Sequence, residues 1–398
     1  MFPKTMKELG TKRSVIRELF EYGNKRKEEI GKENVFDFSL GNPSVAPPPE
    51  VEETIRCLLD TESPVALHGY TSAPGDRGVR RAIAEYINNE FGMDADENDL
   101  YMTVGAAASL CICFNALLEQ GDEVLALAPF FPEYKVFAEK AGGVLKIVPC
   151  RESDFQIDFD ALKASITEKT ALIIVNSPNN PSGAVLTEET IRELSAVLEE
   201  ASTRIGHPIY IVADEPYREL VYGDITVPYI PRYYKNTLIC YSFSKSLSLP
   251  GERIGYIYVP KQTENAADII AGVQGAGRAL GYVCAPSLFQ RVAAACLGKT
   301  ANLTVYKTNR DLLYDSLTSY GYTVVHPDGA FYLFVRALEP DALAFSERAK
   351  KHELLVVPSD DFGMPGYVRV SYCVDTETVR RALPAFKMLA EEYAEGCV

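Results

Sequence analysis

Between residues 100 and 260 the chain repeats short, nearly continuous apolar runs. They are rich in Val, Ile, Leu and Tyr, and most are separated by segments of helical length such as 106–119 and 187–203. Strands without a polar face are typical of a parallel sheet that is covered on both sides. The runs are YMTVG (from 101), DEVLALA (122), GVLKIVP (143), ALIIVNSP (171), PIYIVADEPY (208), TLICYSFS (237) and RIGYIYVP (253). We therefore expect a three-layer α/β/α unit on a mainly parallel sheet of about seven strands, with ligands bound beyond the carboxyl ends of the strands.

The last hundred residues have a different pattern, which indicates a second, smaller α+β domain. A helical segment near 286–320 is followed by GYTVVHP, AFYLFVRAL, a helix, LLVVPS, GYVRVSYCV and a terminal helix. We assign 46–285 to the large domain, and 1–45 together with 286–398 to the small domain. The chain has 398 residues, 47% of them hydrophobic, which is enough core material for two packed units.

Charge and composition exclude several classes of function. The formal net charge is −15, from 40 basic and 55 acidic residues, so the chain would repel a phosphate backbone and we expect no nucleic-acid partner. No stretch reaches about 18 consecutive apolar residues and the start has no hydrophobic signal region, which favours a cytoplasmic protein that does not bind membranes. The cysteines show no CxxC spacing and the histidines no HxxxH or HxH spacing, so we expect reduced thiols and no metal site.

Two of the segments that follow strands could hold part of a ligand. The sequence TVGAAASL places Gly105, Ala106 and Ala107 at the start of a helix, where unpaired amides and the helix dipole can hold a phosphate. Small residues at such a turn also serve close packing. The sequence NSPNNPSG contains Asn176 and Asn180, which are equally ordinary as turn formers. Taken alone, neither segment specifies a function.

The next two strand ends add charged groups and hydroxyls. Asp214 emerges from an apolar run, where a carboxylate needs a cationic partner. The following strand leads into SFSKSLSLPGERIGY, which contains Ser242, Ser244, Lys245 and Arg253. As one site, these segments offer groups for a phosphate, an amine, and a carboxylate that requires a cation. Pyridoxal 5′-phosphate matches all three through its phosphate, its aldehyde and its pyridinium nitrogen.

The order of four motifs resembles the fold-type I, class I/II pyridoxal-phosphate-dependent aminotransferases over essentially the whole chain. The motifs are NSPNNPSG (from 176), ADEPY (213), SFSKSLSLPGERIGY (242) and GYVRVSY (366). The resemblance implies an enzyme that moves an amino group from an amino acid to a 2-oxo acid. Lys245 would form a Schiff base with the cofactor and then serve as general base and acid, and Asp214 would keep the ring nitrogen protonated.

The resemblance also implies the other cofactor contacts. Tyr217 and Asn180 would hydrogen-bond the phenolic oxygen of the ring. Phe131, in APFFPEY, would stack on the ring where the family often has Trp; its neighbour Phe130 is the alternative, and either residue could instead belong to the core. The phosphate would be held by Gly105, Ala106, Ala107, Ser242, Ser244 and Arg253.

Three further residues resemble substrate and subunit contacts of the family. Arg369 in GYVRVSY would bind the substrate α-carboxylate through a two-pronged contact, with a cross-strand ion pair as the alternative. Gly41 in FSLGNPS would lie at the edge of the substrate, and Asn180 would also contact the substrate. Tyr70 in HGYTSAPG would reach the phosphate of the partner subunit, which implies a homodimer with shared active sites.

The sequence says less about the substrate. Some family members that use aspartate have a lysine where this chain has Ala107, whereas Arg278 lies near the position of a cross-subunit arginine that binds the distal carboxylate in another branch. A surface arginine is the alternative for Arg278. We expect aspartate or glutamate as donor and 2-oxoglutarate as acceptor. The alternatives are a C–S β-lyase, or an aminotransferase for aromatic or small neutral amino acids; both would keep Lys245 and Asp214.

Overall fold

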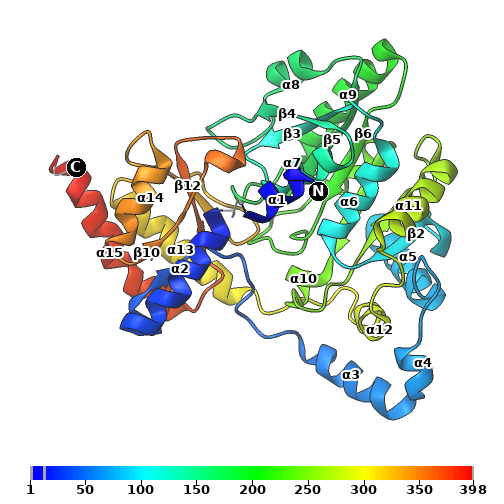
Figure 1. The fold of residues 1–398 in the computed structure, drawn as a ribbon, viewed down its shortest axis with the longest axis horizontal. Coiled ribbons are helices and arrows are strands. Elements are labelled where there is room, and N and C mark those ends of the chain that lie inside the picture. Colours follow the sequence, from blue (N-terminus) through cyan, green and yellow to red (C-terminus); the bar gives the residue numbers. More distant parts are fainter. Residues whose placement is uncertain (1–2, 12–14, 397–398) are drawn as a thin grey trace.

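The computed structural model describes residues 3–11 and 15–396. A sheet forms the centre of the larger part of the molecule (Figure 1), and it has seven strands. In spatial order the strands are β2 (Leu100–Thr103), β8 (Gly255–Tyr258), β7 (Thr237–Ser242), β6 (Tyr210–Asp214), β5 (Thr170–Asn176), β3 (Glu123–Ala128) and β4 (Val144–Pro149). Only β8 runs against its neighbours. The predicted mainly parallel sheet of about seven strands is confirmed.

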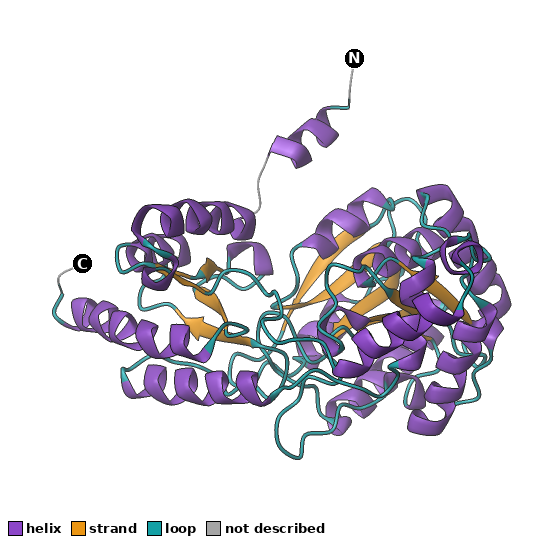
Figure 2. Ribbon diagram, turned by 90° about the horizontal axis from the view of Figure 1, so that it is seen from below, coloured by secondary structure: helices purple, strands orange, loops and turns teal. Residues whose placement is uncertain are grey.

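Helices cover both faces of this sheet, which gives the expected three layers (Figure 2). One face carries α6 (Ala106–Leu117), α7 (Glu133–Lys140) and α11 (Ala266–Leu280). The other face carries α5 (Arg77–Phe91), α8 (Phe159–Ser165), α9 (Glu188–Ile205) and α12 (Ser287–Ala295).

The side chains of β5 explain why its sequence is apolar throughout. Leu172 and Ile174 point into the core cluster with α6 and α11, whereas Ile173 and Val175 point into the opposite cluster with α5 and α9. Each of these four side chains is at most 2% exposed. Because successive side chains of a strand face opposite sides, a strand covered on both sides needs an unbroken apolar run.

A smaller antiparallel sheet lies beside the large one, with spatial order β11 (Val357–Pro358), β12 (Tyr367–Ser371) and β9 (Tyr332–Arg336). Near it, β1 (Phe36–Asp37) pairs in parallel with β10 (Leu354–Leu355). The surrounding helices are α2 (Val15–Ile30), α13 (Thr304–Ser319), α14 (Ala342–Lys350) and α15 (Thr376–Ala394). The pairing of β1 with β10 shows that the start of the chain packs against its last hundred residues.

The domain division 46–285 and 1–45 with 286–398 stays our proposal. In its favour, β1 and the C-terminal strands share one core cluster with α13 and α15. Helix α12, which begins after residue 285, packs instead against α3 (Pro49–Thr61), α4 (Pro64–His68) and α5. The remaining elements are α1 (Lys4–Thr11), α10 (Phe243–Ser246) and the 3₁₀ turns Lys32–Asn34, Glu97–Asp99, Ile230–Arg232 and Asp360–Phe362.

Over the residues that the structure describes, no helix is both long and apolar enough to cross a membrane.

Candidate active site

The candidate site lies where three neighbouring strands end. Asn176, Asp214 and Ser242 are the last residues of β5, β6 and β7. Asn176 is paired with Asp214, and Asp214 with Cys240 two residues before the end of β7. Motifs that are far apart in the sequence therefore meet at the carboxyl edge of the sheet, where an open α/β sheet binds its ligands.

Asp214 is a buried carboxylate with one free oxygen. Its Oδ2 accepts a hydrogen bond of 2.5 Å from the Tyr134 hydroxyl, whereas Oδ1 is buried without a hydrogen-bond partner among the described residues. Burial raises the pKa of Asp214 to about 7, although the hydrogen bond from Tyr134 acts in the opposite direction. A buried acceptor without a partner is costly, so the free oxygen suits a cationic donor such as a protonated ring nitrogen.

Lys245 lies in the short helix α10, just beyond β7. The side chain of Ser242 caps this helix by accepting from the amide of Ser244. The Lys245 Nζ donates a hydrogen bond of 2.7 Å to the carbonyl oxygen of Gly41. Burial, reinforced by the charges of nearby arginines, lowers the pKa of Lys245 to about 8. A larger share of the amine is therefore neutral near pH 7, the form that attacks an aldehyde and accepts a proton.

Gly105, Ser242, Ser244 and Arg253 form a cradle at the N-terminus of α6. Gly105 has a φ of 93°, and a Cβ there would lie 2.7 Å from Nη2 of Arg253. Glycine thus lets the guanidinium approach the helix end, where the amides of Ala106 and Ala107 begin the helix. The Ser244 hydroxyl accepts a hydrogen bond from Ser242 at 2.8 Å and one from Arg253 at 3.4 Å. Amides, hydroxyls and a guanidinium are the groups that suit a phosphate.

Arg369 is a buried cation to which residues 3–11 and 15–396 offer no carboxylate partner. It is 2% exposed, and no ion pair joins it to an acidic side chain within the described residues. Its Nη2 donates to the carbonyl oxygen of Ser39 at 2.6 Å, its Nη1 donates to Oδ1 of Asn180 at 3.0 Å, and its Nε has no partner there. The alternative of a cross-strand ion pair is therefore wrong. A buried guanidinium of this kind needs an anion from outside the chain.

Two aromatic and two amide side chains join these charged groups. The hydroxyl oxygens of Tyr217 and Tyr332 lie 2.8 Å apart, and the guanidinium carbon of Arg369 lies 4.8 Å from the centre of the Tyr332 ring. Asn176 donates to the carbonyl oxygen of Asp214 and accepts from the amide of Asn180, each at 2.8 Å. Asn176 thus connects the segment that carries Asn180 to the strand that carries Asp214.

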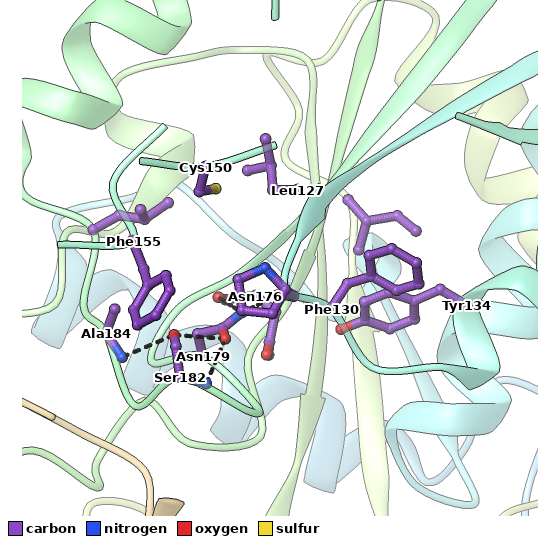
Figure 3. Close-up of a pocket in the computed structure, with 12 residues that line it drawn as sticks. Leu127, Phe130, Tyr134, Cys150, Phe155, Asn176, Asn179, Ser182 and Ala184 are labelled. Carbon is purple, nitrogen blue, oxygen red and sulfur yellow. Dashed lines mark hydrogen bonds between the residues drawn. The ribbon is translucent and has the colours of Figure 1, made fainter. Parts of the chain in front are cut away.

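The two candidate stacking residues lie in different surroundings. Phe130 is 4% exposed, its amide donates to the carbonyl oxygen of Phe362, and its ring stacks on Tyr134 at 6.4 Å between centres. Figure 3 shows Phe130 and Tyr134 on one side of a small pocket, with Asn179 on the other side. Phe131 is only half-buried. Phe130 belongs to the core, which leaves Phe131 as our proposal for the stacking residue.

Tyr70 and Arg278 are not brought to the site within this chain. Tyr70 is 98% exposed, and Arg278 lies exposed on α11. Gly41, in contrast, is at the site, because its carbonyl oxygen accepts from Lys245.

Four site residues were missed by the sequence analysis, namely Tyr134, Asn176 in its bracing role, Ser39 and Tyr332. Tyr134 stands in the APFFPEY segment, whose sequence indicates only a stacking ring, and the position of Asn176 in NSPNNPSG is equally typical of a turn former. Ser39 and Tyr332 carry no local signal, because their partners lie 330 and 115 residues away.

These residues fit pyridoxal phosphate, which supplies an electron-withdrawing ring when bound. The chain offers a buried carboxylate with a free oxygen, an amine of lowered pKa, and a cradle that a side chain at Gly105 would fill. Over the described residues, no group of three or more His, Cys, Asp or Glu side chains could hold a metal ion. Fold and site together define a pyridoxal-phosphate-dependent enzyme of the transaminase type.

Comparison with known proteins supports this class of enzyme. Residues 33–386 match the family described as Aminotransferase class I and II, and the chain belongs to that family. Among solved structures, an amino transferase from Eubacterium rectale is 56% identical, with a TM-score of 0.97 over 99% of each chain. A probable aspartate aminotransferase of Methanocaldococcus jannaschii is 30% identical over 392 residues, 96% of this chain and 98% of the relative. Aromatic-amino-acid aminotransferase 2 of Thermococcus litoralis is 28% identical over 398 residues, 95% and 96% of the two chains.

Replacing Asp214 by Asn should stabilise the cofactor-free protein at alkaline pH. The folded-state pKa of Asp214 is about 7, raised by burial from 3.8, so the folded protein holds a proton that the unfolded chain loses as pH rises between these values. The free-energy cost of ionising Asp214 in the folded protein is therefore small at acidic pH and reaches its full value above pH 7. We expect Asp214→Asn to gain roughly 1–3 kcal/mol more unfolding free energy at pH 8 than at pH 5, measured by urea denaturation. Asp361→Asn, at an exposed position, is the control, and an equal effect of Asp214→Asn at both pH values would contradict the argument.

Replacing Tyr134 by Phe should weaken cofactor binding most near neutral pH. The variant loses the hydrogen bond that lowers the pKa of Asp214, so less of the carboxylate is ionised at pH 7, whereas at pH 9 it is ionised again. We expect the dissociation constant of pyridoxal phosphate to rise about tenfold at pH 7 and clearly less at pH 9, measured by absorbance titration of the cofactor-free protein. Tyr234→Phe is the matched control, because Tyr234 is also 1% exposed and donates to a backbone carbonyl. A loss of the same size at both pH values would show that the hydroxyl of Tyr134 does not act through the protonation state of Asp214.

Proposed function

We propose that the enzyme transfers the amino group of aspartate or glutamate to a 2-oxo acid such as 2-oxoglutarate. The observation that supports this most is Arg369, a buried guanidinium whose Nε has no partner and which no carboxylate of the described residues neutralises. Amino-acid donors and 2-oxo-acid acceptors share an α-carboxylate, so one arginine can bind both in turn.

Lys245 is the proposed catalytic amine. Its Nζ, with a pKa near 8, would take a proton from the α carbon of the substrate. It would then return this proton to the other carbon atom that is joined to the substrate nitrogen, which belongs to the cofactor. Asp214 would hold the ring nitrogen of the cofactor protonated through its free oxygen. The Gly41 carbonyl oxygen keeps Nζ in place at the substrate edge.

The other residues of the site would position the cofactor. Tyr217 and Asn180 would hydrogen-bond its phenolic oxygen, Asn180 would also lie beside the substrate, and Phe131 would stack on the ring. The phosphate would be held by Gly105, Ala106, Ala107, Ser242, Ser244 and Arg253. These roles follow from the resemblance, and the contacts that connect Ser242, Ser244 and Arg253 support them.

A second copy of the chain would complete the site. The segment with α3 and α4 projects from the body of the molecule (Figure 1), and it exposes Leu59 at 56%, Val65 at 84% and Tyr70 at 98%. A homodimer would bury these apolar side chains and bring Tyr70 to the phosphate cradle of its partner. Arg278 would reach the distal carboxylate of the partner's substrate.

The names of the similar proteins help to choose between the proposed function and its alternatives. The three named above are described as aminotransferases, which does not favour a C–S β-lyase. One is described as acting on aromatic amino acids, so phenylalanine belongs in any test of the donor.

A panel of donors tests the proposed function. The holoenzyme is mixed separately with L-aspartate, L-glutamate, L-alanine, L-phenylalanine and L-cystathionine, and the absorbance of the bound cofactor is followed. Aspartate or glutamate should convert the cofactor to its amino form fastest, and 2-oxoglutarate should reverse the change. Faster conversion by phenylalanine or alanine would overturn the donor, and release of pyruvate and ammonia from cystathionine would identify a lyase.

Arg278→Ala should lower activity with dicarboxylic donors alone. We expect kcat/KM for aspartate to fall about 10- to 100-fold, because a charged hydrogen bond is lost, whereas alanine turnover stays unchanged. Mixed dimers of Lys245→Ala and Arg278→Ala subunits show which subunit supplies the arginine. If Arg278 acts across the interface, one site of each mixed dimer is intact and aspartate activity returns; no recovery, or no loss in the single variant, would contradict the role.

A further inference from the structure

Tyr332 connects three groups of the site, and none of the roles above uses it. It is the first residue of β9 and is 2% exposed. Its hydroxyl oxygen lies 2.8 Å from that of Tyr217, and its ring lies under the guanidinium of Arg369 at 4.8 Å. The backbone of Gly41 packs against the hydroxyl so closely that any side chain at Gly41 would collide with it.

The hydroxyl groups of Tyr217 and Tyr332 have only two protons between them. Each tyrosine hydroxyl has one proton to donate, so only one of the pair can donate across the 2.8 Å contact. If Tyr217 donates its proton to the phenolic oxygen of the cofactor, then the contact between the tyrosines must be made by the proton of Tyr332. The hydroxyl of Tyr332 thereby fixes the direction in which Tyr217 donates.

The guanidinium of Arg369 favours Tyr332 as the donor. Burial raises the pKa of both hydroxyls and the charge of Arg369 opposes this for both, but it is the ring of Tyr332 that lies directly against the guanidinium, at 4.8 Å. The more acidic hydroxyl is the stronger donor. A carboxylate that binds Arg369 would cancel part of that charge and weaken the donation from Tyr332 to Tyr217.

We propose that Tyr332 is a positioning residue that orients the hydroxyl of Tyr217 toward the cofactor and transmits carboxylate binding at Arg369 to the phenolic oxygen. This inference rests on the role proposed for Tyr217. It adds a second connection to the one through Asn180, which accepts from Arg369 at 3.0 Å.

The test is the pH midpoint of the visible absorbance of the bound cofactor, measured for the wild type, Tyr332→Phe, Tyr217→Phe and Tyr322→Phe. The Phe variant at 332 keeps the ring under Arg369 and removes only the hydroxyl. Tyr322 is a matched control, since it is 3% exposed and its hydroxyl donates to the carbonyl oxygen of Phe386 at 2.9 Å, outside the site. Each midpoint is measured with and without succinate, which has carboxylates but neither an amino nor an oxo group.

Without succinate, Tyr332→Phe should raise the midpoint by about half a unit to one unit, because a phenolic oxygen that receives a weaker hydrogen bond is more basic. Tyr217→Phe should raise it at least as much, and Tyr322→Phe should leave it unchanged. Succinate should raise the midpoint of the wild type, and this rise should fall by about half or more in Tyr332→Phe.

The outcomes separate this inference from the function on which it rests. If Tyr217→Phe leaves the midpoint unchanged, the proposed role of Tyr217 is wrong and the inference fails with it. If Tyr217→Phe shifts the midpoint but Tyr332→Phe matches the control, Tyr332 is only a core residue. If Tyr332→Phe shifts the midpoint and the full response to succinate remains, Tyr332 does not transmit carboxylate binding, and the inference is overturned.

Discussion

The site depends on two buried ionisable groups of opposite charge that no charged side chain of the described residues neutralises. Asp214 and Arg369 are 5% and 2% exposed, and each has a buried polar atom without a partner in the described residues. Asp214 and Arg369 do not form an ion pair with each other. Burial without full pairing costs folding free energy, and a fold keeps such groups where a ligand completes them. A ligand that presents a cation at one end and a carboxylate at the other satisfies both.

The segment at residues 39–41 ties the two sheets together at this point. The carbonyl oxygen of Ser39 accepts from Arg369 of the small sheet, and that of Gly41 accepts from Lys245 beside the large sheet. This segment follows β1, which pairs with β10. A displacement of the small sheet would therefore change the distance between the carboxylate-binding group and the catalytic amine. The site is a property of the packing of both sheets and the start of the chain.

The sequence predicts what is local and periodic. The run ALIIV is apolar at successive positions because both faces of β5 are covered, so the sheet could be inferred from it, and so could the polar residues at the strand ends. Tyr134 could not be assigned, because its contact with Asp214 joins residues 80 positions apart and its own helix fixes no partner. In the sequence AFYLFVRAL, nothing distinguishes Tyr332 from the core residues beside it. Neighbouring aromatic residues such as Phe130 and Phe131 have the same chemistry, and what distinguishes them is the deeper burial of Phe130 and the hydrogen bond from its amide to the carbonyl oxygen of Phe362.

Burial also explains why the pKa values of Asp214 and Lys245 both lie near neutral pH. It raises the pKa of Asp214 to about 7 and lowers that of Lys245 to about 8, since in each case the charged form is the one that loses hydration. A small interaction is then enough to change either protonation state. A cation at the free oxygen of Asp214 restores the carboxylate, and an anion at Arg369 removes a charge that keeps the Lys245 pKa low. Ligand binding at both ends of the site is thereby linked to proton movement within it.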